Sequence, residues 1–242
     1  MGPSIFATWN VQKCVGLDFR RDPERCARVI ATLKADVVAL QEVDKRLGPR
    51  PAALTHGVVE RLTHLRPVEI AVNDVSIGWH GNAILVSDAI EVSRVVHIDL
   101  PGLEPRGAVM ADLHKGDEDW RVVACHLGLL RRDRRRQFAK ILSVVEERPR
   151  LATVIMGDMN EWSRKKGLEA LHDFDVVMPG NSFHSRRPIA PLDRIAIGPG
   201  VTAGERGVLK TTATRVASDH LPVWVRLEQD RAADHTTTSI SS

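Results

Sequence analysis

The sequence predicts an α/β (α+β) protein in which two mixed β-sheets pack face to face and helices cover their outer surfaces. Short apolar runs rich in β-branched residues outnumber amphipathic helical patterns, and they occur in both halves of the 242 residues. Continuous apolar runs such as residues 151–156 are typical of strands that are buried on both faces. No linker or short repeat interrupts the pattern. We therefore expect one domain over residues 1–228 and a disordered polar tail over residues 229–242.

The first half of the chain begins with a predicted strand over residues 4–11. A helix follows, since Asp22 can cap its N-terminus and Pro23 suits its first turn. The remaining elements expected in this half are a strand at 36–41, a helix at 52–65, and strands near 68–72, 82–86 and 91–98.

The second half begins with a predicted hairpin formed by residues 109–113 and 120–126. Residues 131–148 form the clearest helix, because Phe138, Ile141, Leu142 and Val145 recur at helical spacing on one face. After the strand that precedes Gly157 and Asp158, we expect a helix at 163–171 and strands at 192–197, 208–214 and 221–227.

The composition is typical of a globular protein, and its slight excess of positive charge suits an anionic ligand. The formal net charge is +3, and no apolar run is long enough to span a membrane. The three cysteines, Cys14, Cys26 and Cys125, have neither a zinc spacing nor the pattern of a disulfide framework. Their scatter favours a reducing, cytoplasmic location, and we expect a monomer.

Polar side chains recur where the predicted strands begin or end. Carboxamides and carboxylates at such positions are ordinary turn formers when they occur singly, but a whole set of Asn, Asp, Glu and His is difficult to attribute to turns. The set comprises Asn10, Glu42, His126, Asp158, Asn160, Asp193, Asp219 and His220. Its oxygen-rich, cysteine-free chemistry suits Mg²⁺, with Mn²⁺ as a substitute, and disfavours structural zinc. Such groups fit a metal-assisted attack of water on phosphorus.

These segments resemble the endonuclease/exonuclease/phosphatase superfamily, which includes deoxyribonuclease-like enzymes, abasic-site endonucleases and neutral sphingomyelinases. The resemblance covers roughly residues 4 to 228, in the family's order. The segments that carry it are Trp9-Asn10-Val11, Gln41-Glu42-Val43, Gly81-Asn82-Ala83-Ile84-Leu85, Cys125-His126-Leu127, Gly157-Asp158-Met159-Asn160, Leu192-Asp193-Arg194-Ile195 and Ser218-Asp219-His220. It implies a four-layered α/β sandwich whose active site lies at the edges of the two sheets.

The resemblance also implies a role for each polar residue. Glu42 would be the principal Mg²⁺ ligand, assisted by Asn10 and Asp219. Asp158 would orient or deprotonate the attacking water, and Asn160 would position the phosphate. His220, held by Asp193, would act as a base or stabilise the transition state.

Three further expectations concern substrate contacts. His126 matches a histidine that contacts the phosphate in several branches, although a structural histidine at a strand end is the alternative. Asn82 is expected near the substrate. Arg131, Arg132 and Arg135 crowd the start of the 131–148 helix, where they form either a phosphate-facing patch or a solvated helix face.

Departures from the family pattern leave the substrate open. Gln12 stands where abasic endonucleases carry an aspartate, which removes one charge from a second metal site, and the chain contains no tyrosine. The implied function is Mg²⁺-dependent hydrolysis of a phosphate ester on a lipid head group or small molecule. The alternatives are a DNA or RNA nuclease and an inactive phosphate-binding module. Because aromatic residues make up only 4% of the chain, nucleic acid is the less favoured substrate.

Overall fold

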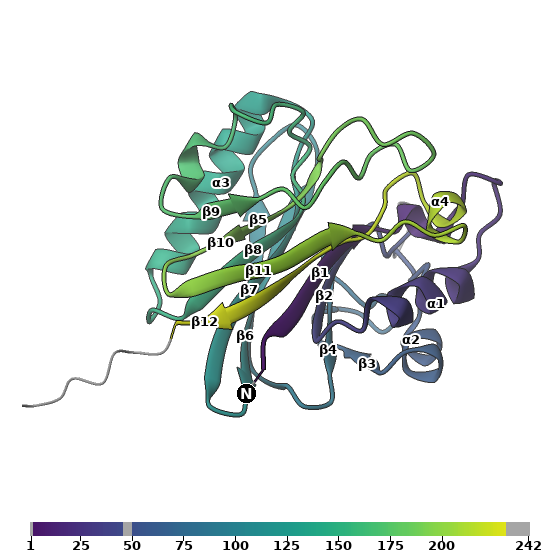
Figure 1. Ribbon diagram of the computed structural model, residues 1–242, viewed down its shortest axis with the longest axis horizontal. Coiled ribbons are helices and arrows are strands. Elements are labelled where there is room, and N and C mark those ends of the chain that lie inside the picture. The colour runs from purple at the N-terminus through teal and green to yellow at the C-terminus, as the bar shows by residue number, and fades with distance from the viewer. Residues whose placement is uncertain (1, 46–49, 231–242) are drawn as a thin grey trace, which may run out of the picture.

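Two six-stranded β-sheets stack face to face in the computed structural model, which describes residues 2–45 and 50–230 (Figure 1). The first sheet contains, in spatial order, β11 (Val201–Val208), β12 (Val223–Gln229), β1 (Ser4–Asn10), β2 (Val37–Gln41), β4 (Ala83–Ser87) and β3 (Leu65–Pro67). The second contains β5 (Glu91–Leu100), β6 (Arg106–Lys115), β7 (Glu118–His126), β8 (Ala152–Asp158), β10 (Asp193–Ile197) and β9 (Asp175–Val177). Both sheets mix parallel and antiparallel pairs, which confirms the predicted architecture.

Helices complete the four layers. The buried residues of α1 (Pro23–Leu33) and α2 (His56–Leu62) share an apolar cluster with the outer face of β1 and β2. On the opposite side, α3 (Arg131–Glu146) packs Phe138 and Ile141 against the outer face of the second sheet (Figure 1). Among the described residues, no helix has both the length and the apolar character needed to cross a bilayer.

The central core lies between the two sheets. Alternate residues of each strand face it, as the pleat requires, so Phe6 and Ala39 of the first sheet meet Trp120 and Val122 of the second. The rings of Phe6 and Trp120 lie 4.8 Å apart between centroids. This apolar layer fixes the separation and the relative position of the sheets, and therefore the position of the polar groups at their edges.

The expected start of α1 is confirmed in detail. Asp22 is the N-cap, and its Oδ1 accepts a hydrogen bond of 2.9 Å from the backbone N–H of Arg25. Pro23 occupies the first turn, where its missing N–H costs nothing. The buried side chains of the helix, from Cys26 to Leu33, follow the predicted stripe.

Predictions for several short elements were wrong. Residues 68–72 form no strand, because the segment that pairs with β4 is Leu65–Pro67. This segment starts soon after α2 ends, where the Thr63 hydroxyl donates a hydrogen bond to the carbonyl oxygen of Val59. Residues 163–171 form only the 3₁₀ turn η2 (Glu169–Leu171). Here the Ser163 hydroxyl accepts from two backbone N–H groups, and Gly167 takes a left-handed φ of 90° that interrupts a helix.

The last wrong assignment concerns residues 208–214. The strand in this region, β11, covers Val201–Val208 and therefore ends where the predicted strand begins. The predicted range ends at the start of the short helix α4 (Thr214–Ala217). Strand β9 was not predicted, since it has only three residues. At the C-terminus, β12 runs to Gln229, one residue past the expected domain boundary, and residues 231–242 of the expected tail lie outside the described part of the chain.

Gly157 is required by the close approach of β7 to β8. A Cβ built on it would lie 1.8 Å from the carbonyl oxygen of Cys125. We predict that Gly157→Ala lowers the free energy of unfolding by about 3 kcal/mol or more, because the two strands must separate. Urea denaturation measures this loss. Gly204→Ala is the control: its Cβ would meet nothing closer than 3.6 Å, so a similar loss there would contradict the explanation.

Candidate active site

The register of three neighbouring strands brings His126, Asp158 and Asp193 together. Asp158 at the end of β8 lies opposite His126 on one side and opposite Asp193 on the other. Directly paired residues project to the same face of a sheet. Two residues away along these strands, Ala124, Met156 and Ile195 belong to the core between the sheets. The three polar side chains therefore point toward the first sheet at its edge.

Asp158 is the centre of this group. Its side chain is 2% exposed, and its Oδ2 accepts a 3.1 Å hydrogen bond from Asn10 Nδ2 at the end of β1. The same oxygen lies 3.5 Å from His126 Nε2 and 3.6 Å from His220 Nε2. Its Oδ1 accepts from the backbone N–H of Asn160. Donors from both sheets therefore surround one buried carboxylate.

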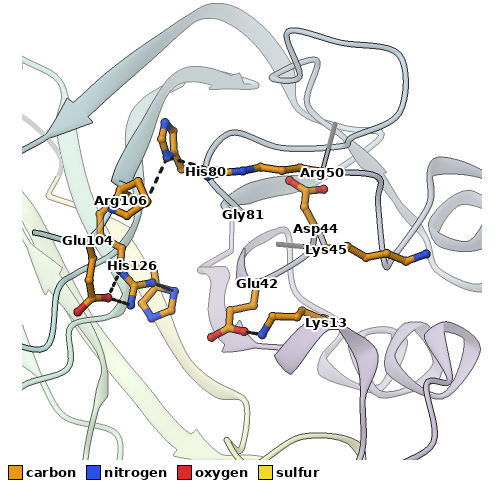
Figure 2. Close-up of a pocket in the computed structure, with 11 residues that line it drawn as sticks. Lys13, Glu42, Asp44, Lys45, Arg50, His80, Gly81, Glu104, Arg106 and His126 are labelled. Carbon is orange, nitrogen blue, oxygen red and sulfur yellow. Dashed lines mark hydrogen bonds and ion pairs between the residues drawn. The ribbon is translucent and has the colours of Figure 1, made fainter. Parts of the chain in front are cut away.

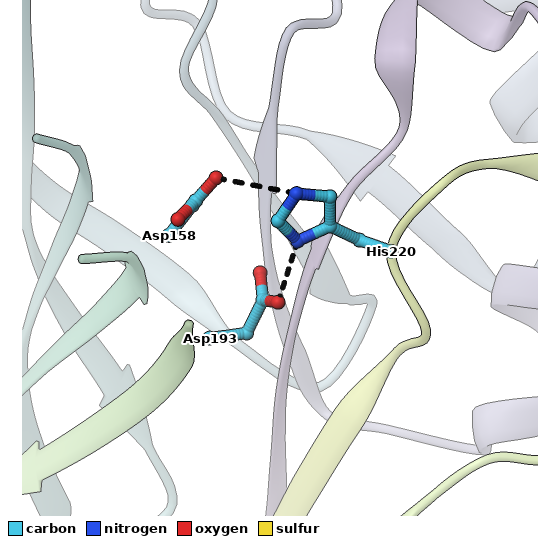
Figure 3. Close-up of side chains that lie close together, drawn as sticks. All are labelled: Asp158, Asp193 and His220. Carbon is cyan, nitrogen blue, oxygen red and sulfur yellow. Dashed lines mark hydrogen bonds and ion pairs between the residues drawn. The ribbon is translucent and has the colours of Figure 1, made fainter. Parts of the chain in front are cut away.

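His220 lies between two carboxylates (Figure 3). Its Nδ1–H donates to Asp193 Oδ2 at 2.7 Å, while Nε2 faces Asp158. The hydroxyl of Ser182 donates to the same oxygen of Asp193 at 2.5 Å, and Trp9 Nε1 donates to the backbone carbonyl of His220. The ring of Phe183 covers one side, 5.0 Å from the imidazole. These contacts fix the orientation of the imidazole.

The two histidines beside Asp158 carry different charges. Burial alone would lower the pKa of His220, but the charges of Asp193 and Asp158 and the hydrogen bond to Asp193 raise it to about 10. Burial lowers the pKa of His126 to about 3, with Arg106 contributing in the same direction. Arg106 donates to His126 Nδ1 at 2.9 Å, and since arginine can only donate, the neutral ring carries its proton on Nε2.

The expected metal ligands meet around a tight turn, η1 (Gln12–Cys14). The backbone N–H of Gln12 donates to Asn10 Oδ1, and the Gln12 side chain accepts from the N–H of Asp219. Lys13 forms an ion pair with Glu42. Left-handed φ values of 48°, 56° and 56° run through Gln12, Lys13 and Cys14, and Glu42 has a φ of 55°. Non-glycine residues in this region are uncommon and concentrate at functional sites.

A cavity of about 260 Å³ opens beside Glu42 and His126 (Figure 2). Lys13 and Glu42 line one side, and Glu104, Arg106 and His126 line the opposite side. We call it the polar pocket; its remaining lining residues in the described chain are Asp44, Lys45, Arg50, His80, Gly81 and Pro105.

The donor chemistry around Glu42 fits a hard divalent cation. Glu42, Asn10 and Asp219 supply oxygen atoms only, which Mg²⁺ and Mn²⁺ prefer. The Lys13 ammonium against Glu42 shows that this position accommodates a positive charge. Asp158, Asp193 and His220 form a second candidate group, with ligand atoms within 4.8 Å of one another. In that group His220 is already bonded through Nδ1 to Asp193, which suits proton handling better than metal ligation.

The two asparagines expected near the substrate lie in different places. Asn160, at a left-handed φ of 51°, sits beside Asp158 and donates one amide hydrogen to Leu127 O at 2.8 Å. Asn82 is fully buried, donates to the carbonyls of Trp79 and Gly107, and does not line the polar pocket. Contact of either residue with substrate stays a prediction.

The arginines at the start of α3 divide into two kinds. Arg131 and the buried Arg134 both bond Glu161, whose side chain is 1% exposed. Burial alone would raise the pKa of Glu161, but hydrogen bonds from Arg131, the Ser163 N–H and Arg134 lower it to about 2. Arg132 and Arg135 are largely exposed, near Asp133 and Glu169 at 3.6 and 3.9 Å. Only this second pair has both guanidinium groups largely in solvent.

Sequence reasoning missed several residues that build the site. Glu161 stands directly after Asn160, and this adjacency to a predicted site residue was the available signal. Lys13 follows Asn10 by three positions and gave a similar signal. Arg106 and Ser182 gave none, because each reaches the site through a contact that is distant in sequence.

Comparison with known proteins identifies the family. The sequence profile of the Endonuclease/Exonuclease/phosphatase family matches residues 7–220. The chain belongs to this family. Its members are generally phosphoesterase or nuclease hydrolases. No curated protein matches the chain.

Solved structures with the same fold cover nearly the whole chain. A functionally unknown conserved protein from Enterococcus faecalis V583 is 18% identical, with a TM-score of 0.75, over 93% of this chain and 99% of that one. The D. rerio TDP2 complexed with single-strand DNA product is 18% identical, with a TM-score of 0.72, over 94% and 99%. The Bacteroides thetaiotaomicron mannosyl-6-phosphatase Bt3783 is 16% identical, with a TM-score of 0.72, over 93% and 99%. At these identities the likeness establishes the fold alone.

The neutral state of His126 can be tested by pH titration. Its folded-state pKa of about 3 lies below the ordinary value of 6.5, so its contribution to stability is complete above pH 6.5 and is lost as pH falls toward 3. We predict that ¹⁵N NMR of the metal-free protein finds its ring neutral at pH 5. The variant His126→Gln, which cannot titrate, should lose less stability between pH 6.5 and 4 than the wild type. Equal losses in both proteins would contradict the assignment.

Proposed function

We propose that this protein is a divalent-metal-dependent hydrolase of phosphate esters. The observation that supports this most directly is the buried carboxylate of Asp158, which joins amide and imidazole groups of one sheet edge to those of the other. Glu42, Asn10 and Asp219 would hold a Mg²⁺ ion beside it. When bound, this ion supplies positive charge to the phosphate oxygens and to a nearby water.

The protein's own groups are assigned complementary tasks. Asp158 would accept the proton of the attacking water, since its carboxylate lies where the two sheet edges meet, with the imidazoles of His126 and His220 on either side. His220, an imidazolium in the metal-free protein, would donate a hydrogen bond to the negative charge that develops on phosphorus-bound oxygen. Of the two roles left open for His220, its charge favours transition-state stabilisation over proton abstraction. Asp193 and Ser182 would keep its ring in position.

Two further groups would hold the phosphate in place. Asn160 keeps a second amide hydrogen beyond the one donated to Leu127 O, and that hydrogen suits a phosphate oxygen. His126, neutral with its proton on Nε2 near Asp158, would donate a hydrogen bond to a phosphate held between it and Glu42 at the inner boundary of the polar pocket. Neither group needs to change protonation state during the reaction.

Metal dependence and the division of labour can be tested together. Hydrolysis of bis-(p-nitrophenyl) phosphate should vanish in EDTA and return on addition of Mg²⁺ or Mn²⁺. Glu42→Gln should weaken Mg²⁺ binding measured by calorimetry. His220→Ala should leave that affinity nearly unchanged and lower kcat by about 10²–10⁴-fold, as loss of a group that acts in the transition state does.

Two results would reject the proposal. Full hydrolysis in EDTA would show that no cation is needed. An equal loss of Mg²⁺ affinity in Glu42→Gln and His220→Ala would show that the two residues do not have separate roles. Asp117→Asn, in the β6–β7 turn at the far end of those strands, is a charge-matched control that should change neither quantity.

A nuclease is the second candidate function. Trp162 is 57% exposed and stands edge-on to Phe183, which in turn contacts His220. Exposed aromatic rings and cationic side chains near a reaction centre suit single-stranded nucleic acid. The exposed Arg132 and Arg135 would supply the charge.

The arginine pair separates these functions. If the substrate is a nucleic acid, reversing Arg132 and Arg135 to Glu should raise KM for single-stranded DNA steeply and flatten the salt dependence by about one unit of slope per lost contact. Arg131 is left unchanged, because a carboxylate there would face the buried Glu161. Arg136→Glu with Lys140→Glu, further along α3, makes the same change in charge. Equal effects of the two pairs would mean that the patch is a solvated helix face.

A further inference from the structure

The polar pocket lies next to the proposed reaction centre, and of its lining residues the steps above use only Glu42 and His126. Its lining residues come from the segments after β1 and β2 on one side and from the β5–β6 connection and the end of β7 on the other. Glu42 and His126 form its inner boundary, so a group attached to a phosphate held between them can extend into it (Figure 2).

The charges that face the pocket are largely balanced. Lys13 is paired with Glu42, and the Arg106 guanidinium bonds Glu104 at 2.6 and 3.0 Å. Arg50 stretches above Asp44 toward His80, whose Nδ1 lies 3.5 Å from its guanidinium (Figure 2). The Lys45 ammonium points away from the cavity (Figure 2). A second phosphate group would have to compete with carboxylates for Lys13 and Arg106.

Large apolar side chains are scarce in this pocket. Apart from Gly81, Pro105 is the only apolar residue among its described lining residues, and the aromatic rings among them are the imidazoles of His80 and His126. A nucleobase would find no Phe or Trp ring, only imidazoles that already contact an arginine, and a lipid chain would find no large apolar side chain. The volume of about 260 Å³ is also below the range of about 300–1,000 Å³ that is usual for drug-sized ligands.

Asp44 supplies an independent sign of a missing partner. Its side chain is buried, with the residue 6% exposed, yet its Oδ1 has no hydrogen-bond donor among the described residues. A buried carboxylate oxygen without a donor is costly and uncommon. A ligand hydroxyl would satisfy it, whereas a phosphate or carboxylate would be repelled.

We propose that the polar pocket binds an uncharged, hydroxyl-rich group of about monosaccharide size, carried by the phosphate ester, with Asp44 accepting one of its hydroxyl hydrogens. Hydroxyl groups both donate and accept, so they match walls in which carboxylates alternate with guanidinium and imidazole groups. This assignment rests on the proposed function and narrows its substrate class to esters of sugars or polyols.

Substrate selectivity tests the assignment. The readout is the ratio of kcat/KM for D-glucose 6-phosphate, or for glycerol 3-phosphate, to kcat/KM for p-nitrophenyl phosphate, which has no hydroxyl. Asp44→Asn keeps the size of the side chain but replaces one acceptor oxygen by a donor. It should lower this ratio by roughly 10- to 100-fold, the range expected for a lost hydrogen bond to a charged group.

The control is Asp99→Asn, a carboxylate that is 86% exposed near the outer nitrogen of His80 and does not line the pocket. It should leave the ratio unchanged. Thermal unfolding of Asp44→Asn should show no loss of stability, since Asp44 Oδ1 accepts no hydrogen bond from any residue that the structure describes. An unchanged ratio in Asp44→Asn would overturn the assignment, as would a marked preference for D-glucose 1,6-bisphosphate or for thymidine 5′-(p-nitrophenyl phosphate).

Failure of the proposed function would be recognised separately. If none of these esters is hydrolysed with Mg²⁺ or Mn²⁺, binding of D-glucose 6-phosphate is followed by saturation-transfer NMR. Binding to the wild type that Asp44→Asn abolishes would support the pocket assignment without hydrolysis. Binding that is absent, or equal in the two proteins, would overturn it.

Discussion

The structure depends on the compensation of one buried negative charge. Asp158 lies where the two sheets meet, and a carboxylate removed from water must receive hydrogen bonds and positive charge from the protein. Asn10 from the first sheet donates a hydrogen bond, the His126 imidazole of the second sheet lies 3.5 Å away, and His220, which precedes β12, supplies the positive charge. Leaving such a carboxylate uncompensated costs about 3–5 kcal/mol, so the arrangement that makes the site also constrains how the sheets pack.

The inventory of polar residues at strand ends could be predicted from the sequence because strand geometry is simple. Short apolar runs with abrupt polar endings identified β1, β2, β7 and β8, and the parallel pairing of β1 with β2 and of β7 with β8 places the carboxyl ends of each pair at one edge. The residues expected at the reaction centre therefore came together, although their chemical roles stay predictions. Positions that depend on loop conformation were harder to predict: the helix expected at 163–171 failed because Ser163 and Gly167 redirect the backbone.

Charge patterns were informative only in part. The crowded arginines of α3 suggested either substrate binding or solvation, and neither reading anticipated that Arg131 and Arg134 hold the buried Glu161. This arrangement anchors the segment after Asn160 to the helix, so part of the basic surface is structural. Asp44 shows the opposite case. No sequence pattern marks it, because the lack of a donor for its buried oxygen among the described residues is a property of the folded chain alone.

The pairing of β1 with β12 has a consequence for when the protein becomes active during its synthesis. The first strand of the chain cannot complete its sheet until the last strand, which follows His220, has left the ribosome. Nascent chains therefore lack both the central strand pairing and the imidazolium, and contacts between such distant segments form slowly. A nascent chain that ends before His220 would lack the assembled group of Asp158, Asp193 and His220. Any function that needs this group would then arise in a single step, once β12 can pair with β1, and not gradually as the chain lengthens.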